Sequence, residues 1–402
     1  ITSTAGITVG SLAVGHGLGG DVSNAAVGYG ALDESISSTA RCTAIGSSAL
    51  GELKHPSQDN TAVGSAALQE LIGHFAGATG EDNTAVGSFA LQTTTQGLRN
   101  TAVGMSAMKS GDCADDNTAV GNLALKVFTG SDAVAVGSGA ADAATSATGL
   151  TAVGYNALGA CTDGTGNTAV GKDAGATLTT GDYNTALGAL ALDDSVIDTQ
   201  KNTAIGYGAL SGACTDDNTG VGYFSLVNFT GSNATAVGSG AAAAATSAGS
   251  TTSVGYKSLE NLTTASYNTA LGYYALNKAV NQVNTAVGTS ASSNLGDAQH
   301  TVAIGFSALQ GTSFNESCTT STSSSPATVV NTADTRIIVG VVVTGTGIPA
   351  GTRVKTVTDS THFVMGNAAG ADVSATVSAT NSLTFYENQG DYNVAIGNYA
   401  LD

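Results

Sequence analysis

The sequence predicts an all-β protein: a parallel β-solenoid (a β-roll or β-helix) with rungs of about 17 residues and a small antiparallel β module inserted near the C-terminus. Three observations support this fold. A nonapeptide, Asn-Thr-Ala-Val-Gly-x-x-Ala-Leu, recurs along most of the 402 residues, as at 117–125. Its copies keep a nearly constant spacing. The residues between copies are rich in Gly, Ser, Thr, Asp and Asn, which favour turns and leave no room for an ordinary helix.

The glycine of the nonapeptide marks the phase of the repeat. From Gly10 to Gly305 it returns in 17 steps over 295 residues. A unit this short cannot bury a core alone, so neighbouring rungs must stack on one another. The glycine occurs at Gly10, Gly28, Gly46, Gly64, Gly87, Gly104, Gly121, Gly137, Gly154, Gly171, Gly188, Gly206, Gly222, Gly238, Gly255, Gly272, Gly288 and Gly305, and again at Gly397.

The centre of the motif predicts a short strand. Counting positions from the glycine, Ala at minus two lies on one face, whereas Thr at minus three and Val at minus one lie on the other. Both faces are small or apolar, which favours a strand buried on two sides. We expect Val, Ala and the Leu at plus four to stack in columns. The glycine would supply a bend or a close backbone approach.

The Asn at minus four predicts a structural ladder inside the coil, because stacked side-chain amides can donate and accept along a column. A ligand-binding role is the less favoured alternative. Ten rungs carry this residue: Asn60, Asn83, Asn100, Asn117, Asn167, Asn184, Asn202, Asn218, Asn268 and Asn284.

Position plus one varies in chemistry, which indicates a surface or interface column. Tyr29 is its first tyrosine, and exposed tyrosines could stack on sugar rings. The favoured alternative is that they cover the strand face or pack against a neighbouring chain. The residues considered as surface or glycan contacts are Tyr155, Tyr207, Tyr223, Tyr256 and Tyr273.

Composition excludes several functions. With 30 acidic and 12 basic residues the net charge is -18, which disfavours nucleic acid and anionic membranes as partners. No apolar run is long enough to span a bilayer, and residues 1–6 are not a signal peptide, so a leader has been removed, the chain is a fragment, or none was needed. Only 10% of residues are charged, and no paired carboxylates converge on one groove, so we expect no enzyme activity.

No cofactor or metal is expected, because the histidines lie in different phases of the repeat. Asp82, Asp116 and Asp217, each just before the motif Asn, could form a carboxylate column that holds Ca²⁺. Solvated turn carboxylates are favoured, since the glycine-rich calcium-binding nonapeptide of β-rolls is absent.

The cysteines predict free thiols or bonds between chains. Cys113, Cys161 and Cys214 recur three rungs apart, roughly 14 Å at the strand spacing, which is too far for a disulfide. Four Asn-x-Ser/Thr sequons would matter only on a glycosylating secretory route: Asn228, Asn233, Asn261 and Asn315.

The pattern divides the chain into three parts. Residues 1–311 form the solenoid shaft. Residues 312–389 begin with a Ser/Thr-rich linker and continue as short β-branched runs between turns, which predicts the inserted antiparallel module. Residues 390–402 resume the repeat, as a further rung or as a segment that docks between subunits.

The Asn-Thr-Ala-Val-Gly-x-x-Ala-Leu rungs resemble the repeats of bacteriophage tail-fibre proteins, notably of marine and cyanobacterial phages, and more distantly the head repeats of trimeric autotransporter adhesins. The segment Val343-Thr344-Gly345-Thr346-Gly347-Ile348-Pro349-Ala350-Gly351-Thr352 is similar to a small β unit that accompanies phage fibre repeats. The resemblance implies a homotrimeric fibre that binds a host surface.

We therefore expect an extracellular structural protein, either a virion tail fibre or a cell-surface adhesin, whose shaft contributes to attachment to a host glycan or protein. The alternative is a filament subunit that polymerises head to tail through its terminal rungs, since open strand edges can be extended by another copy. In both cases the main partner is another copy of the chain, without membrane insertion.

Overall fold

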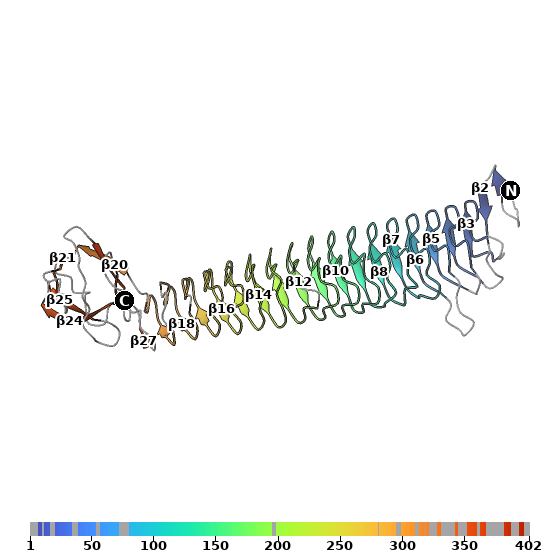
Figure 1. Ribbon diagram of the computed structural model, residues 1–402. Coiled ribbons are helices and arrows are strands. Elements are labelled where there is room, and N and C mark those ends of the chain that lie inside the picture. The colour runs from blue at the N-terminus through green and yellow to red at the C-terminus, as the bar shows by residue number, and fades with distance from the viewer. Residues whose placement is uncertain are drawn as a thin grey trace. The chain divides into compact units, whose positions relative to one another are not determined.

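The computed structural model describes residues 7–9, 12–16, 21–33, 39–53, 57–71, 80–194, 198–279, 281–294, 299–309, 313–317, 319–320, 328–330, 342–344, 352–359, 362–366, 382–386 and 394–397. The chain divides into two compact units, Ile1–Thr235 and Ala236–Asp402. The regular elements of the described residues are all strands (Figure 1).

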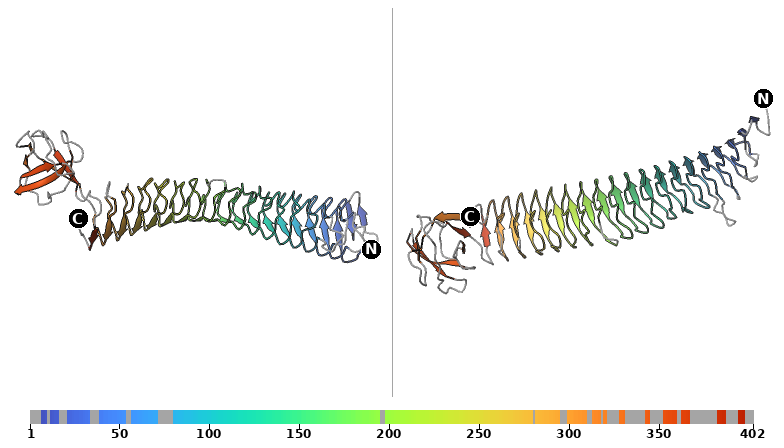
Figure 2. Two further views of the ribbon diagram at one scale, coloured as in Figure 1. Left: turned by 60° about the horizontal axis from the view of Figure 1, so that its bottom comes forward. Right: turned by 45° about the horizontal axis from the view of Figure 1, so that its top comes forward.

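The first unit is a parallel β-solenoid, as the sequence predicted. Each motif forms a strand of three residues that pairs in register with the next, so that Ala119 faces Ala135 and Ala152 faces Ala169. The strands lie side by side in chain order (Figure 2). They are β3 (Ala25–Val27), β4 (Thr43–Ile45), β5 (Thr61–Val63), β6 (Thr84–Val86), β7 (Thr101–Val103), β8 (Thr118–Val120), β9 (Val134–Val136), β10 (Thr151–Val153), β11 (Thr168–Val170), β12 (Thr185–Leu187), β13 (Thr203–Ile205) and β14 (Thr219–Val221).

The first copy of the motif, around Gly10, departs from the parallel ladder. β1 (Ile7–Val9) pairs antiparallel with β2 (Leu12–Gly15), and β2 pairs antiparallel with β3. This hairpin covers the N-terminal edge of the solenoid, which would otherwise present unpaired backbone groups.

The second unit contains a parallel ladder of the same kind, which resumes after a long interruption in the sequence. β19 pairs in parallel with β27, with Val302 opposite Val394, although about 90 residues separate them in sequence. The solenoid strands of this unit are β16 (Thr252–Val254), β17 (Thr269–Leu271), β18 (Thr285–Val287), β19 (Val302–Ile304) and β27 (Val394–Ile396), and β15 (Thr235–Val237) lies at the boundary between the units.

A separate antiparallel sheet forms between β19 and β27 in sequence. Its strand order is β20-β26-β23-β24-β25-β22-β21, and neighbouring strands pair antiparallel. The strands are β20 (Ser313–Ser317), β21 (Thr319–Thr320), β22 (Thr328–Val330), β23 (Val342–Thr344), β24 (Arg353–Asp359), β25 (His362–Gly366) and β26 (Ser382–Tyr386). The exact domain boundaries stay a prediction, because residues 310–312 and 387–393 lie outside the described part.

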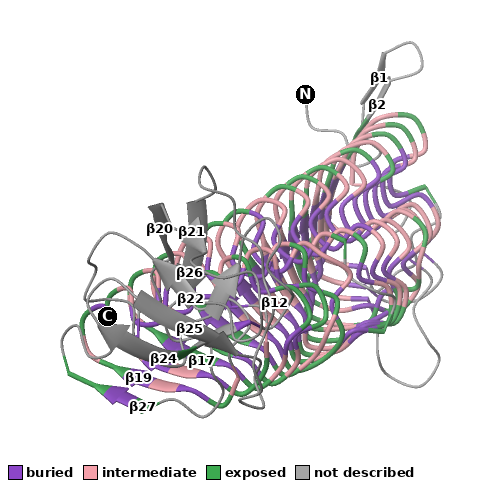
Figure 3. Cartoon of the chain, turned by 60° about the vertical axis from the view of Figure 1, so that its left-hand side comes forward, coloured by how far each residue is buried: buried purple, intermediate pink, exposed green. Residues whose placement is uncertain are grey.

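The core of each coil is narrow, and only one face of each strand belongs to it. Ala119 and Leu125 are fully buried, whereas Thr118 is half-buried and Val120 is 36% exposed. Buried residues line the inner side of the coils (Figure 3). The expectation of strands buried on both faces is therefore wrong, because the rung closes around one interior and the Thr/Val face of its strand remains outside.

The rung turns through corners with left-handed backbone conformations. Asp116, Leu123 and Leu125 have φ values of 63°, 61° and 48°, and equivalent positions of other rungs repeat this pattern. Residues other than glycine, asparagine and aspartate seldom adopt such backbone angles, which cost about 1 kcal/mol each at positions such as Leu123 and Leu125. Stacking of the rungs must offset that cost.

Candidate functional site

The outer strand face is the most extensive candidate surface. In both units it consists of the columns at minus three and minus one, which carry Thr, Val, Ile, Leu and one Ala but no charged residue. Leu187 and Leu271 are about half exposed there. Side chains repeat at the strand spacing of about 4.8 Å along such a face. We call these two columns the Thr/Val face.

Two aromatic clusters lie at positions plus one and plus two. In the first unit, the rings of Tyr207 and Tyr223 stack with centroids 5.7 Å apart and an interplanar angle of 18°. Phe224 packs against both at 5.4 Å and 4.4 Å. Because the stacked rings turn faces toward each other, a sugar would meet their edges or the two end faces of the stack.

The second unit repeats the arrangement. Tyr256 and Tyr273 stack at 5.3 Å and 18°, and Tyr274 lies edge-on to both. Lys257 places Nζ 5.7 Å from the Tyr256 centroid and forms an ion pair with Glu260 at 2.7 Å. Charged groups therefore border this cluster. The third ring also differs between the clusters: it is Tyr274 here and Phe224 in the first unit.

The other tyrosines of the plus-one column are exposed without a stacked tyrosine partner in the described residues. Tyr29 is exposed, and Tyr155 has Lys172 Nζ 5.8 Å from its ring centroid. Lys172 also pairs with the carboxylate of Asp173. The sequence-predicted tyrosines thus form two pairs and two separate side chains. Sequence reasoning overlooked Phe224 and Tyr274, which stand one position later.

The ten ladder asparagines are all buried, and each occupies the same position of its rung. Asn117 shows their bonding: its Oδ1 accepts the backbone N–H of Ala133 in the next rung at 3.0 Å, and its Nδ2 donates to the carbonyl of Gly130 at 3.0 Å. Direct amide-to-amide contacts occur as well, as between Asn184 Nδ2 and Asn167 Oδ1 at 3.2 Å. The amides mainly join each rung to the backbone of the next, which is a structural role.

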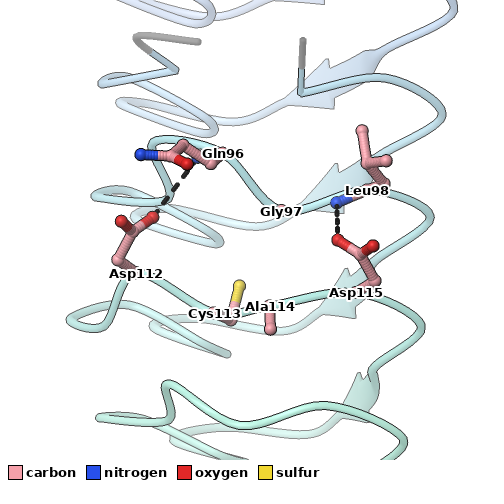
Figure 4. A pocket seen from close by; sticks show the side chains of 7 residues that line it. All are labelled: Gln96, Gly97, Leu98, Asp112, Cys113, Ala114 and Asp115. Atoms are coloured by element: carbon pink, nitrogen blue, oxygen red, sulfur yellow. Dashed lines mark hydrogen bonds between the residues drawn. The ribbon is translucent and has the colours of Figure 1, made fainter. Parts of the chain in front are cut away.

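A second set of side-chain caps was not evident from the sequence. Asp112 accepts the backbone N–H of Thr95 at 2.8 Å, and Asp115 accepts that of Leu98 at 3.0 Å, each in the preceding rung. Asp112, Asp115 and Leu98 line an open cavity of about 260 Å³ (Figure 4). Both carboxylates are already used by backbone donors, so this cavity offers little to a ligand. Asp182 and Asp216 form similar caps, because they accept the backbone N–H groups of Thr165 and Gln200. Asp163 instead accepts the side-chain hydroxyls of Ser146 and Thr145 in the preceding rung.

Acid is expected to weaken the contacts of Asp163 with the preceding rung. Hydrogen bonds from the hydroxyls of Ser146 and Thr145 lower the pKa of Asp163 below its ordinary value of 3.8. A lowered folded-state pKa means that the stabilisation is fully present above about pH 4 and is lost as pH falls through the folded pKa. The free energy of unfolding of Asp163→Asn should fall less between pH 5 and pH 2.5 than that of the wild type, and equal slopes would contradict the assignment.

The three candidate calcium residues, Asp82, Asp116 and Asp217, all lie in left-handed corners of their rungs. The carboxylate of Asp116 forms an ion pair with Arg99 at 2.6 Å. Among the described residues no group of three or more His, Cys, Asp or Glu side chains could hold a metal ion.

Four cysteines are free and buried: Cys42, Cys113, Cys161 and Cys214. Burial raises the pKa of the Cys113, Cys161 and Cys214 thiols to about 11, so they remain protonated at neutral pH. Cys318 lies outside the described residues.

Three of the four sequon asparagines have described side chains, and all three are exposed: Asn228, Asn233 and Asn261. Asn315 lies in β20, opposite Thr384. In the part of the chain that the structure covers, no helix is long and apolar enough to cross a membrane.

Comparisons with protein-family models, with curated proteins and with solved structures find no match to this chain.

Proposed function

We propose that the chain is the structural shaft of an extracellular attachment fibre, either a phage tail fibre or a cell-surface adhesin, and that it has no enzymatic role. The β-solenoid is compatible with a structural fibre. Many of its polar side chains join one rung to the next: the Asn column, the Asp caps and the ion pair between Arg99 and Asp116 connect neighbouring turns of the coil.

The observation that carries the proposal is the Thr/Val face. The minus-one column of this face carries Val, Ile or Leu in every rung, and in several rungs the side chain is more than a third exposed, as at Ile45, Leu187 and Leu271. Neither column of the face carries a charged residue, so its composition is that of an interface core rather than of a free surface. We propose that copies of the chain associate side by side through this face as a homotrimer. The aromatic clusters and the antiparallel sheet would remain available for contact with a host glycan or protein.

Charge introduced on this face should separate the chains. The double variant Val120→Asp/Leu187→Asp would bury unpaired carboxylates in the interface, at about 3 kcal/mol or more, which weakens association about 100-fold. Sedimentation equilibrium should show three-chain particles for the wild type and single chains of 39.1 kDa for the variant.

Val22→Asp is the matched control, because Val22 is exposed but lies outside the two columns. It should leave the particle mass unchanged. A wild-type protein that stays at the mass of one chain at every concentration would contradict the proposed association.

The second candidate is head-to-tail polymerisation, and β27 favours it. Val394 and Ile396 are 63% and 70% exposed, against 39% for Ile304 in the neighbouring strand, so β27 offers apolar surface that another rung could cover. The antiparallel β1–β2 hairpin opposes it, since this hairpin occupies the edge of β3 that a parallel rung would need. Particles that lengthen with concentration in electron micrographs would favour the polymer over the trimer.

A further inference from the structure

We propose that the stacked tyrosines of adjacent rungs are sites of oxidative cross-linking, in which Tyr207 couples to Tyr223 and Tyr256 couples to Tyr273. The inference does not depend on the proposed fibre function. It rests on two copies of one arrangement: a tyrosine pair on consecutive rungs, stacked at 5.7 Å in one unit and 5.3 Å in the other.

The solenoid holds each pair in place. Tyr207 and Tyr223 each stand two residues after the end of a strand, β13 and β14. These two strands pair in register, with Thr203 opposite Thr219, so the tyrosines that follow them are brought side by side. All four rings are about half exposed, so a soluble oxidant can reach the phenols. Rings held side by side react as if at a high local concentration, which favours coupling within the chain over coupling between chains.

The reaction needs a one-electron oxidant, such as a haem peroxidase with hydrogen peroxide. Each phenol loses one electron and one proton to give a phenoxyl radical. The two radicals join through a carbon–carbon bond between ring carbons ortho to the oxygens, and the hydrogens on those carbons move to oxygen to restore both phenols. One hydrogen peroxide accepts the two electrons and two protons and becomes two water molecules.

Such a bond would supply the covalent link between rungs that the described cysteines do not. Cys113, Cys161 and Cys214 are buried and free. A tyrosine link would instead join neighbouring rungs on the outside of the coil, where oxidant has access.

The first cluster gives the cleaner test, because its third ring is Phe224, which has no phenol to compete. Equal amounts of unlabelled and ¹⁵N-labelled chain are mixed, oxidised with peroxidase and hydrogen peroxide, digested, and analysed by mass spectrometry. We expect a Tyr207–Tyr223 peptide that is two hydrogen atoms lighter than its parts, with both halves unlabelled or both labelled.

Tyr223→Phe keeps the ring stack and removes one phenol, so it should abolish this peptide without altering the fold. Tyr183 and Tyr267 are internal controls, because they are more exposed, at 61% and 62%, but have no tyrosine at the same position of the adjacent rungs. The residues at that position are Gly166 and Lys201 for Tyr183, and Ser250 and Val283 for Tyr267. The stacked pairs should give roughly tenfold or more dityrosine than these separate tyrosines. Equal yields at Tyr183 and Tyr267, or links mainly between labelled and unlabelled chains, would overturn the proposal.

Discussion

Replacing Gly137 by alanine is expected to destabilise the solenoid by about 3 kcal/mol or more, because it combines a forbidden backbone angle with a steric clash. Gly137 has φ of +142°, and a Cβ there would lie 2.2 Å from the carbonyl oxygen of Gly154 in the next rung. The clash is with backbone, so neither rung can relieve it by rotating a side chain. Chemical denaturation and hydrogen exchange of the β9 and β10 amides would measure the loss.

Gly139→Ala is the matched control, two residues away in the same rung. Gly139 has φ of +66°, and a Cβ there would meet nothing within 4 Å. Other rungs place Leu123 or Asn156 at this position with similar angles. We expect a loss of about 1 kcal/mol. If both variants lost a similar free energy of unfolding, the close backbone stacking at Gly137 would not be the reason for glycine at that position.

Replacing Asn117 by alanine should cost about 3 kcal/mol, because it leaves several buried backbone groups without a partner. The side chain is fully buried, accepts from Ala133 N–H, and donates to the carbonyls of Ala114 and Gly130. The denaturation midpoint should fall accordingly. Asn122→Ala, which removes only a half-exposed amide donating to the Met105 carbonyl, should change stability by less than about 0.5 kcal/mol.

Asn117→Asp keeps the shape of the side chain and removes its hydrogen-bond donor, so it tests the hydrogen bonds separately from the packing. The carboxylate can still accept from Ala133 but cannot donate to Gly130, and its buried charge faces that carbonyl oxygen, so its folded-state pKa should rise. A raised pKa means that the destabilisation is greatest at neutral pH and shrinks as pH falls through that pKa. A loss of stability for Asn117→Ala no larger than that for Asn122→Ala would contradict the structural role of the column.

Much of the solenoid could be predicted from the repeat. The spacing of the motif glycines places Thr203 beside Thr219, as the pairing confirms. It left open whether residues 390–402 continue this shaft or dock between subunits, and the structure pairs Val302 with Val394. The spacing also brings Tyr207 next to Tyr223, since both occupy position plus one of consecutive rungs. Periodicity is sufficient here because, in a one-dimensional stack, each rung contacts only its neighbours.

The candidate surface could be predicted only in part. Tyrosine positions were evident from the sequence, but the ring orientations, the contribution of Phe224 and the Asp112 cap depend on distances across rungs. Aspartate is common in turns, so its presence alone does not distinguish a solvated carboxylate from one that caps a neighbouring rung.

The sequence by itself determined the period, the parallel register and the identity of the stacked columns. Only the tertiary structure decided which of these columns face inward. A Thr-Ala-Val strand has two small or apolar faces, and its composition does not reveal which one the coil encloses. The left-handed corners at residues such as Leu123 and Leu125 set the direction in which the rung closes. They place Ala119 inside and leave Thr118 and Val120 on the outer face, where we propose that the chains meet.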